Sequence, residues 1–101
     1  MSVVKFEIQL TSEAEQDLAE IYAWYLGKSE LVAERFSSEA IATIDSLVYF
    51  PFRFSVRFNN YRSVSVHKFP YYVFYRILDN QVQIAKIWHH KRDLRGLEFF
   101  E

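Results

Sequence analysis

The residues best suited to chemistry lie near the end of the chain, where His89 and His90 are followed by Lys91 and Arg92. Histidine exchanges protons near neutral pH, and lysine and arginine bind anionic groups such as carboxylates and phosphates. A cationic segment of this kind has the electrostatics to meet an anionic surface. The sequence therefore predicts an anionic partner for this part of the protein.

Other kinds of chemistry lack the residues that they need. The chain has no cysteine, so disulfides and thiolate metal sites are excluded. His89 and His90 are adjacent in a predicted strand and point to opposite faces, so they cannot easily share a metal ion, and no carboxylate cluster lies near them. Ser63 and Ser65 have no neighbouring acid–base relay, and there is no glycine-rich phosphate loop. We expect no metal and no cofactor.

Length and composition predict one ordered domain over residues 1–101. Half of the residues are hydrophobic and 19% are aromatic, with only two glycines and two prolines, which is typical of a globular protein with a core. No run of eighteen apolar residues could span a membrane, and the N-terminal residues lack the features of a signal peptide. We therefore expect a soluble cytoplasmic protein with no membrane contact.

The net charge of −1 conceals two halves of opposite charge. Residues 1–50 contain nine acidic and three basic side chains, a net charge of −6, whereas residues 51–95 contain nine basic and two acidic ones, a net charge of +7. The basic half can attract an anionic partner, although lysine and arginine also serve solubility on strand-rich surfaces. We favour a binding role for the basic half.

The element that must position the histidines is a β-hairpin. Two runs rich in β-branched and aromatic residues, 69–78 and 81–89, meet at Asp79-Asn80, a pair that tolerates a tight turn. A two-residue turn predicts that Ile77 faces Val82, Tyr75 faces Ile84, Val73 faces Lys86 and Tyr71 faces Trp88. The opposite face then carries Tyr72, Phe74, Arg76, Ala85, Ile87 and His89. Both faces of the hairpin are substantially apolar.

The remaining elements follow from periodicity and capping. Residues 3–10 alternate as a half-buried strand. Ser12 and Glu15 form a capping box that opens a helix, which Gly27 ends. Ser29 opens a second helix that runs to about Phe50, before Pro51. Residues 52–60 are predicted as a connecting segment, residues 61–68 as a strand, and residues 93–101 as a short helical or frayed tail.

The predicted fold is α+β with the order βααβββ, an antiparallel sheet with a helical hairpin packed on one face. Two helices cannot cover both faces of the sheet. The other apolar face, with residues such as Tyr72, Phe74 and Ile87 or their opposite-face neighbours, must be covered by the tail or by another chain. This predicts a protein partner.

These elements resemble the RelE/ParE toxin superfamily of type II toxin–antitoxin systems. The first helix reads Ala14-x-x-Asp17-Leu18-x-Glu20-Ile21-x-x-x-Tyr25, and the hairpin reads Phe69-Pro70-Tyr71-x-Val73-x-Tyr75-Arg76, then Val82-x-Ile84 and Ile87-x-His89-x-x-Arg92-Asp93-Leu94. The resemblance spans nearly the whole chain in the right order, and the ending from His89 to Leu94 is closer to ParE-like members.

The resemblance implies a growth-inhibiting toxin, of the kind involved in plasmid stabilisation, that forms a hetero-oligomer with a cognate antitoxin. ParE-like members act on DNA gyrase, whereas RelE-like members cut messenger RNA on the ribosome. We favour the gyrase inhibitor, because Tyr72 replaces an arginine often found in the nucleases and the chain ends without their tyrosine or lysine-rich tail. The ribosome-dependent endonuclease is the alternative.

Site residues follow from these two activities. RNA cleavage without a metal needs a base, an acid and fixed cations, for which the candidates are His89, His90, Arg62 and Arg92. The expected target-binding residues are Arg62, Lys68, Arg76, Lys86, His89, Lys91 and Arg92. The expected antitoxin-binding residues are Tyr22, Tyr25 and Phe36, although these can equally be core residues, Phe36 above all.

Overall fold

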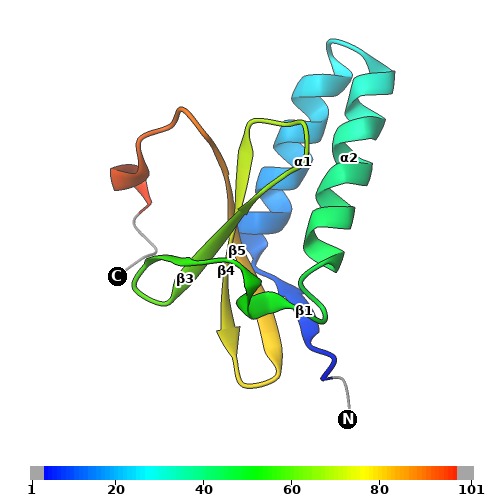
Figure 1. Ribbon diagram of the computed structural model, residues 1–101. Helices are drawn as coiled ribbons and strands as arrows, with labels where there is room; N and C mark the ends of the chain where they lie inside the picture. The colour runs from blue at the N-terminus through cyan, green and yellow to red at the C-terminus, as the bar shows by residue number, and fades with distance from the viewer. Residues whose placement is uncertain (1–3, 98–101) are drawn as a thin grey trace.

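The fold is a single five-stranded sheet with two antiparallel helices on one face (Figure 1). The computed structural model describes residues 4–97. The strands are β1 (Glu7–Leu10), β2 (Val56–Phe58), β3 (Tyr61–Ser65), β4 (Tyr71–Leu78) and β5 (Gln81–His89). The helices are α1 (Ser12–Leu26) and α2 (Glu30–Asp45), with short 3-10 turns η1 (Pro51–Arg53) and η2 (Leu94–Gly96). The predicted α+β class and helical hairpin are confirmed.

The sheet has the order β1-β5-β4-β3-β2. β1 runs parallel to β5, so the prediction of an antiparallel sheet is wrong for this pair and correct for the other neighbours. The segment predicted as a connection contains the short edge strand β2, because Val56 and Phe58 pair with β3. β1 begins at Glu7, α2 ends at Asp45 and β3 ends at Ser65, so these elements are shorter than predicted. Residue 3 of the predicted strand and residues 98–101 of the predicted tail lie outside the described residues.

The helices begin at polar caps. Ser29 caps α2 as predicted, since its hydroxyl accepts a hydrogen bond from the amide of Val32. The prediction of Ser12 as the cap of α1 is wrong by one residue: the hydroxyl of Thr11 accepts from the amide of Ala14. Thr11 and not Ser12 caps the helix because the Thr11 hydroxyl also donates a hydrogen bond to the carbonyl of Ala85, 2.8 Å away. This bond joins the start of the helix to β5. Neither helix is long and apolar enough to cross a membrane.

The β4–β5 hairpin forms at the predicted turn but contains a bulge. Near the turn the predicted pairs are correct, with Ile77 opposite Val82 and Tyr75 opposite Ile84. Phe74 then pairs with Lys86, so Ala85 has no partner residue on β4. The predicted pairs beyond this point are wrong, because the extra residue shifts Val73 onto Ile87 and Tyr71 onto His89.

The bulge also reverses the face of the sheet to which each side chain in the last third of β5 points, since side chains alternate along a strand. Ile87, predicted on the same face as Tyr72 and Phe74, lies instead on the opposite face, in the core beneath the helices. Trp88 takes the opposite face with Phe74 and Ala85. His89 moves with Ile87, and its ring contacts Tyr71, which packs against the helical core.

The sheet therefore has two apolar cores. The larger lies between the sheet and the helices, and its buried residues are Ala14, Ile44, Leu47, Val66, Val73, Tyr75, Val82, Ile84 and Ile87. The smaller lies on the other face and comprises Tyr61, Phe74, Ala85, Trp88 and Leu97, with Phe58, Tyr72 and Leu94 against it. Leu94 and Leu97 come from the C-terminal segment, so part of this face is covered by the tail, one of the two covers predicted.

Asp17 fastens α1 to the strand just past the bulge. One carboxylate oxygen accepts from the ammonium of Lys86 at 2.9 Å, and the other accepts from the amide of Ile87 at 3.0 Å. The Asp17 side chain is only 13% exposed and that of Lys86 21%. The amide of Ile87 is thereby satisfied where the shifted register would otherwise strain the pairing.

Replacing Asp17 with alanine removes the acceptor for a backbone amide and for a charged side chain. Hydrogen bonds to charged groups contribute about 1.5–3 kcal/mol, so we expect the D17A variant to lose about 2–3 kcal/mol of unfolding free energy in urea denaturation. The control is Arg95→Ala, which removes an exposed ion pair with Asp93 and should leave the stability unchanged. Equal stability of D17A and the wild type would refute the role given to Asp17.

Candidate functional site

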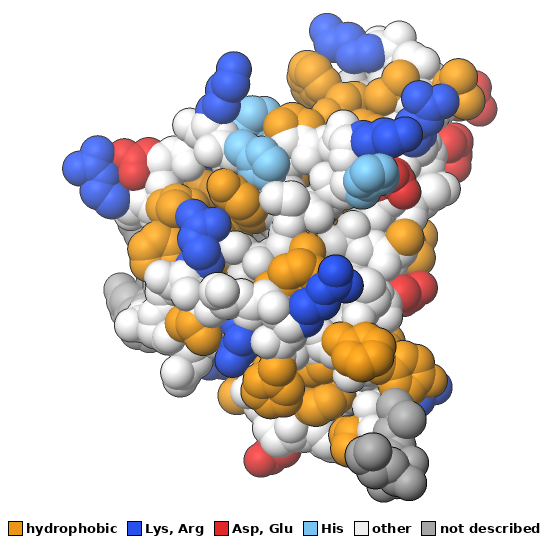
Figure 2. All heavy atoms as spheres, viewed as in Figure 1, with side chains coloured by type: hydrophobic (Ala, Val, Ile, Leu, Met, Phe, Trp, Pro, Cys, Tyr) orange, Lys and Arg blue, Asp and Glu red, His pale blue; other side chains and the backbone are white. Residues whose placement is uncertain are grey.

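The seven predicted target-binding residues do not form one continuous surface. Figure 2 shows lysine and arginine side chains dispersed over the visible face, with apolar and uncharged groups between them. Three of the seven, Arg76, Lys86 and Arg92, line one cavity, and the other four lie elsewhere.

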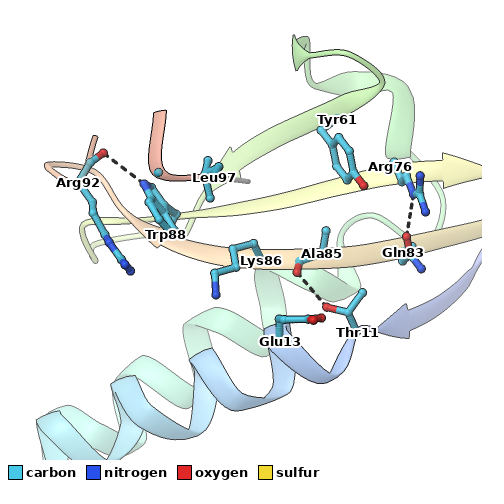
Figure 3. A pocket seen from close by; sticks show the side chains of 11 residues that line it. Thr11, Glu13, Tyr61, Arg76, Gln83, Ala85, Lys86, Trp88, Arg92 and Leu97 are labelled. Atoms are coloured by element: carbon cyan, nitrogen blue, oxygen red, sulfur yellow. Dashed lines mark hydrogen bonds between the residues drawn. The ribbon is translucent and has the colours of Figure 1, made fainter. Parts of the chain in front are cut away.

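This cavity has a volume of about 500 Å³ and lies along β5, between the start of α1 and the C-terminal segment (Figure 3). Its cations come from β4, β5 and the turn after β5. The other lining residues are Thr11, Glu13, Tyr61, Gln83, Ala85, Trp88, Gly96 and Leu97. Glu13, Tyr61 and Gln83 were not among the predicted site residues, because only the folded chain brings them into one cavity with Arg76.

Neighbours hold the three cations in place. The Nε of Arg76 donates to the Oε1 of Gln83 at 2.7 Å, and its guanidinium lies 5.4 Å from the ring centre of Tyr61. The guanidinium of Arg92 lies 3.9 Å from the ring centre of Trp88, whose indole N–H donates to the carbonyl of Arg92. Such stacking and forked donors suit the recognition of carboxylate or phosphate groups.

The cavity is better equipped for binding than for catalysis. Among residues 4–97 no histidine lines it, and Glu13 contributes the one lining carboxylate. Lys86 is already paired with Asp17, which lowers its capacity to stabilise a further negative charge. The arrangement offers fixed cations for an anion but no pair of groups for proton transfer.

The two histidines are separated by the sheet. The ring centre of His89 lies 5.1 Å from that of Tyr71 on the helical side, and the ring of His90 lies 4.2 Å from Tyr72 on the other side. The Nδ1 of His89 accepts from the amide of Lys91, and the Nε2 of His90 lies 3.3 Å from the Ser65 hydroxyl. No group of three or more His, Asp or Glu side chains within residues 4–97 is placed to hold a metal ion.

Arg62 lies away from both histidines. It pairs with Tyr75, four residues along β4 from the partner of His89, which corresponds to about 13 Å of strand. Its guanidinium donates to the carbonyl of Phe54 at 2.6 Å and lies 5.2 Å from the ring centre of Phe52. The structure thus does not bring the four nuclease candidates His89, His90, Arg62 and Arg92 together.

The remaining two predicted cations flank the same end of the sheet as the histidines. Lys68 is exposed in the turn between β3 and β4, where its φ of 67° lies in the left-handed region. Lys91 is exposed directly after β5. Neither forms an ion pair within residues 4–97, so both charges remain available to a partner.

A groove between the two helices contains two of the three predicted antitoxin-binding residues. It has a volume of about 290 Å³ and is lined by Leu18, Ala19, Tyr22, Phe36, Ser37, Ala40, Ile41 and Ile44. Phe36 is only 1% exposed and forms the floor, as its core interpretation predicts. The Tyr22 hydroxyl donates to Glu34 of α2, and this hydrogen bond is the main reason why the pKa of Tyr22 is raised.

Tyr25, the third predicted antitoxin-binding residue, lies in an aromatic cluster at the end of the helical pair. Its ring centre is 5.6 Å from that of Phe36 and 5.4 Å from that of Phe69. A neighbouring cavity of about 420 Å³ is lined by Trp24, Tyr25, Pro70, Tyr71 and His89. His89 thus belongs to an aromatic site beside the helices rather than to the cavity of Arg76.

Tyr71 provides a test of this packing. Burial, followed by the effect of the adjacent Tyr25, raises the pKa of Tyr71 from 10.0 to about 12, and burial raises that of Tyr75 to about 12. Between pH 10 and pH 12 the unfolded chain therefore binds fewer protons than the folded protein. Stability should be fully present below pH 10 and should decrease up to pH 12. The Tyr71→Phe variant should show a shallower decrease in urea denaturation; the same slope as the wild type would contradict this assignment.

Comparisons with known proteins bear on the whole chain. The model of the family described as ParE toxin of type II toxin–antitoxin system, parDE, matches residues 8–94. A comparison with curated protein sequences found no match. Among solved structures, the chromosomal ParDE toxin–antitoxin system from P. aeruginosa is similar, with a TM-score of 0.76 and 17% sequence identity over 84% of this chain and 96% of that one.

At 17% identity the structural likeness concerns the fold, which is that of the ParDE protein. The family match covers nearly all the described residues and confirms the resemblance found in the sequence. This chain belongs to the family of ParE toxins of type II toxin–antitoxin systems.

Proposed function

We propose that this protein arrests growth by acting on DNA gyrase in the cytoplasm and that a cognate antitoxin neutralises it in a hetero-oligomer. The observation that carries the choice of gyrase is the separation of the four nuclease candidates. Arg62 is tethered to Phe54, His89 and His90 lie on opposite faces, and Arg92 stacks on Trp88. Cleavage of RNA requires such groups around one phosphate, whereas a binding surface does not.

The cations suit a binding role at the end of the sheet. Lys68 and Lys91 are exposed there, and Arg92 is exposed beside them at the edge of the cavity. Exposed positive charges favour encounter with an acidic protein surface and raise the association rate. In this proposal they contact the target.

The groove between α1 and α2 suits the antitoxin. Its lining is almost entirely apolar, and Ile41 on its rim is 57% exposed. An apolar groove between two helices accommodates the apolar face of a partner helix. We propose that Tyr22 and Ile41 contact the antitoxin and that Phe36 supports the groove from below.

Ribosome-dependent cleavage of messenger RNA is the second candidate, because one group of residues favours it. His90 lies beside Tyr72 and near the Ser65 hydroxyl, and the guanidinium of Arg57 lies 5.0 Å from the Tyr72 ring centre. On this open face of the sheet, His90 can exchange a proton with a bound substrate while the guanidinium of Arg57 stabilises the charge of a phosphate.

Pulse labelling after induction of the gene in bacteria tests the two activities. We expect methionine incorporation to continue in the first minutes while thymidine incorporation decreases and DNA breaks accumulate, because gyrase inhibition stops replication first. An immediate stop in methionine incorporation would instead favour the ribosomal nuclease.

The same assay tests the cationic surface. The Lys91→Glu, Arg92→Glu double variant should abolish growth arrest and retain the thermal midpoint, since both side chains are exposed. Arg95→Glu is the matched control, because Arg95 is equally exposed but pairs with Asp93 outside the predicted surface. Full toxicity of the double variant would exclude this surface.

The groove is tested by Ile41→Glu. A carboxylate on the rim is tolerated in the free protein but would be buried without a partner beneath an antitoxin helix, so we expect at least about 30-fold weaker binding, the factor for roughly 2 kcal/mol. Binding of the purified antitoxin and rescue of growth are the measurements. Leu31→Glu is the control, since Leu31 lies on the same helix, is 68% exposed and does not line the groove. Equal binding by both variants would place the antitoxin elsewhere.

A further inference from the structure

The segment from Tyr49 to Val56 exposes more apolar surface than folding requires. Phe50 is 67% exposed and Phe52 62%, and the side chains of Tyr49 and Val56 are also largely exposed. In Figure 2 apolar side chains gather at the lower end of the visible face, where Figure 1 shows this segment crossing beside β1. We name these four residues the aromatic ledge. Contiguous exposed aromatic groups of this kind mark interaction sites in soluble proteins.

The aromatic ledge is held rigidly by buried polar contacts. Pro51 at its centre is buried, and its carbonyl accepts from the Tyr75 hydroxyl at 2.7 Å in the core. Arg62 fixes the end of the segment through the carbonyl of Phe54. Phe52 packs edge-on against Phe6, with 6.0 Å between ring centres. The chain therefore holds the aromatic side chains outward and cannot simply fold them into the core, which lowers the entropic cost of binding.

The stretch of sequence that contains the aromatic ledge carries charge of one sign. No Asp or Glu occurs between Asp45 and Asp79, whereas the same stretch contains Arg53, Arg57, Arg62, Lys68 and Arg76. The guanidinium of Arg53 lies 5.4 Å from the Phe54 ring centre, and that of Arg62 lies against Phe52. Aromatic and arginine residues are enriched where protein interfaces gain most of their energy.

Two observations favour a protein segment over a nucleic acid. The guanidinium of Arg62 and the ring of Phe6 already contact Phe52, so bases would compete for the stacking positions on this ring. The arginine also donates to backbone carbonyls, which leaves fewer donors for a phosphate chain. Apolar area surrounded by cations is complementary to apolar side chains flanked by carboxylates.

We propose that the aromatic ledge binds a segment of the toxin's protein target that carries both acidic and apolar side chains. This inference rests on the proposed function for the identity of the target, gyrase. The ledge lies beyond the C-terminal end of α2 and shares no residue with the lining of the helical groove. Target and antitoxin therefore contact different residues of the toxin.

The test compares Phe50→Ser, the Phe50→Ser, Phe52→Ser double variant, and Arg53→Glu with the wild type. Leu31→Ser is the matched control, since it removes an equally exposed apolar side chain from α2. Each protein is assayed for growth arrest, for binding to immobilised purified gyrase at low and high salt, and for binding to the antitoxin. Thermal unfolding shows whether each variant is folded. Phe52 contacts Phe6, so the double variant can be destabilised; Phe50→Ser leaves this contact intact and keeps the test valid in that case.

We expect the double variant to bind gyrase about 30-fold or more weakly, as hot-spot residues do, and to lose growth arrest while it retains antitoxin binding. Arg53→Glu should weaken binding most at low salt. Full toxicity of the folded double variant overturns the inference, and so does loss of antitoxin binding, which would make the ledge part of the antitoxin site.

The two proposals can fail separately. If the wild type arrests growth without binding gyrase, gyrase is not the target. The effect of the variants on growth arrest then remains the test of whether the aromatic ledge binds the target. Binding of each protein to a labelled single-stranded DNA or RNA is the remaining measurement. If the wild type binds the nucleic acid and the variants lose this binding together with growth arrest, the ledge is a nucleic-acid surface and the inference is overturned.

Discussion

The bulge at Ala85 is the constraint on which the rest of the structure depends. α1 holds it from three points, through the Thr11 amide on the carbonyl of Ile84, the Thr11 hydroxyl on the carbonyl of Ala85, and the Asp17 carboxylate on the amide of Ile87. These bonds satisfy backbone groups of β5 at and beyond its last pair with β1, Leu10 opposite Ile84. The start of the first helix and the end of the last strand are therefore one structural unit, although about seventy residues separate them in the sequence.

The bulge also decides where the chemistry-bearing residues lie. One extra residue exchanges the faces of everything after it, so Ile87 and His89 lie on the helical side and Trp88 and His90 on the other. Trp88 then becomes the platform on which Arg92 stacks and over which the C-terminal segment folds. A regular hairpin would have placed Ile87 on the same face as Phe74, and the core beneath the helices would have lost this buried side chain.

The surfaces that we propose for partners differ in chemical character. The groove between the helices is apolar, the cavity beside β5 contains fixed cations, and the ledge at Phe50 and Phe52 combines aromatic side chains with arginine. Each rests on a rigid element of the fold. If the antitoxin and the target bind distinct surfaces, as we propose, the antitoxin neutralises the toxin by obstructing access of the target and not by competing for the same residues.

The sequence by itself determined the fold class, the helical hairpin, the Ser29 cap and the turn at Asp79-Asn80, because periodicity, capping and turn preferences act over a few residues. It also determined the family, since the quoted patterns span the chain. Only the tertiary structure decided the register beyond Tyr75, because the bulge is stabilised by Thr11 and Asp17 of a distant helix. For the same reason it alone decided that the cations divide among separate surfaces and that Phe50 and Phe52 stay exposed: a side chain's neighbours are set by long-range packing, which no local pattern records.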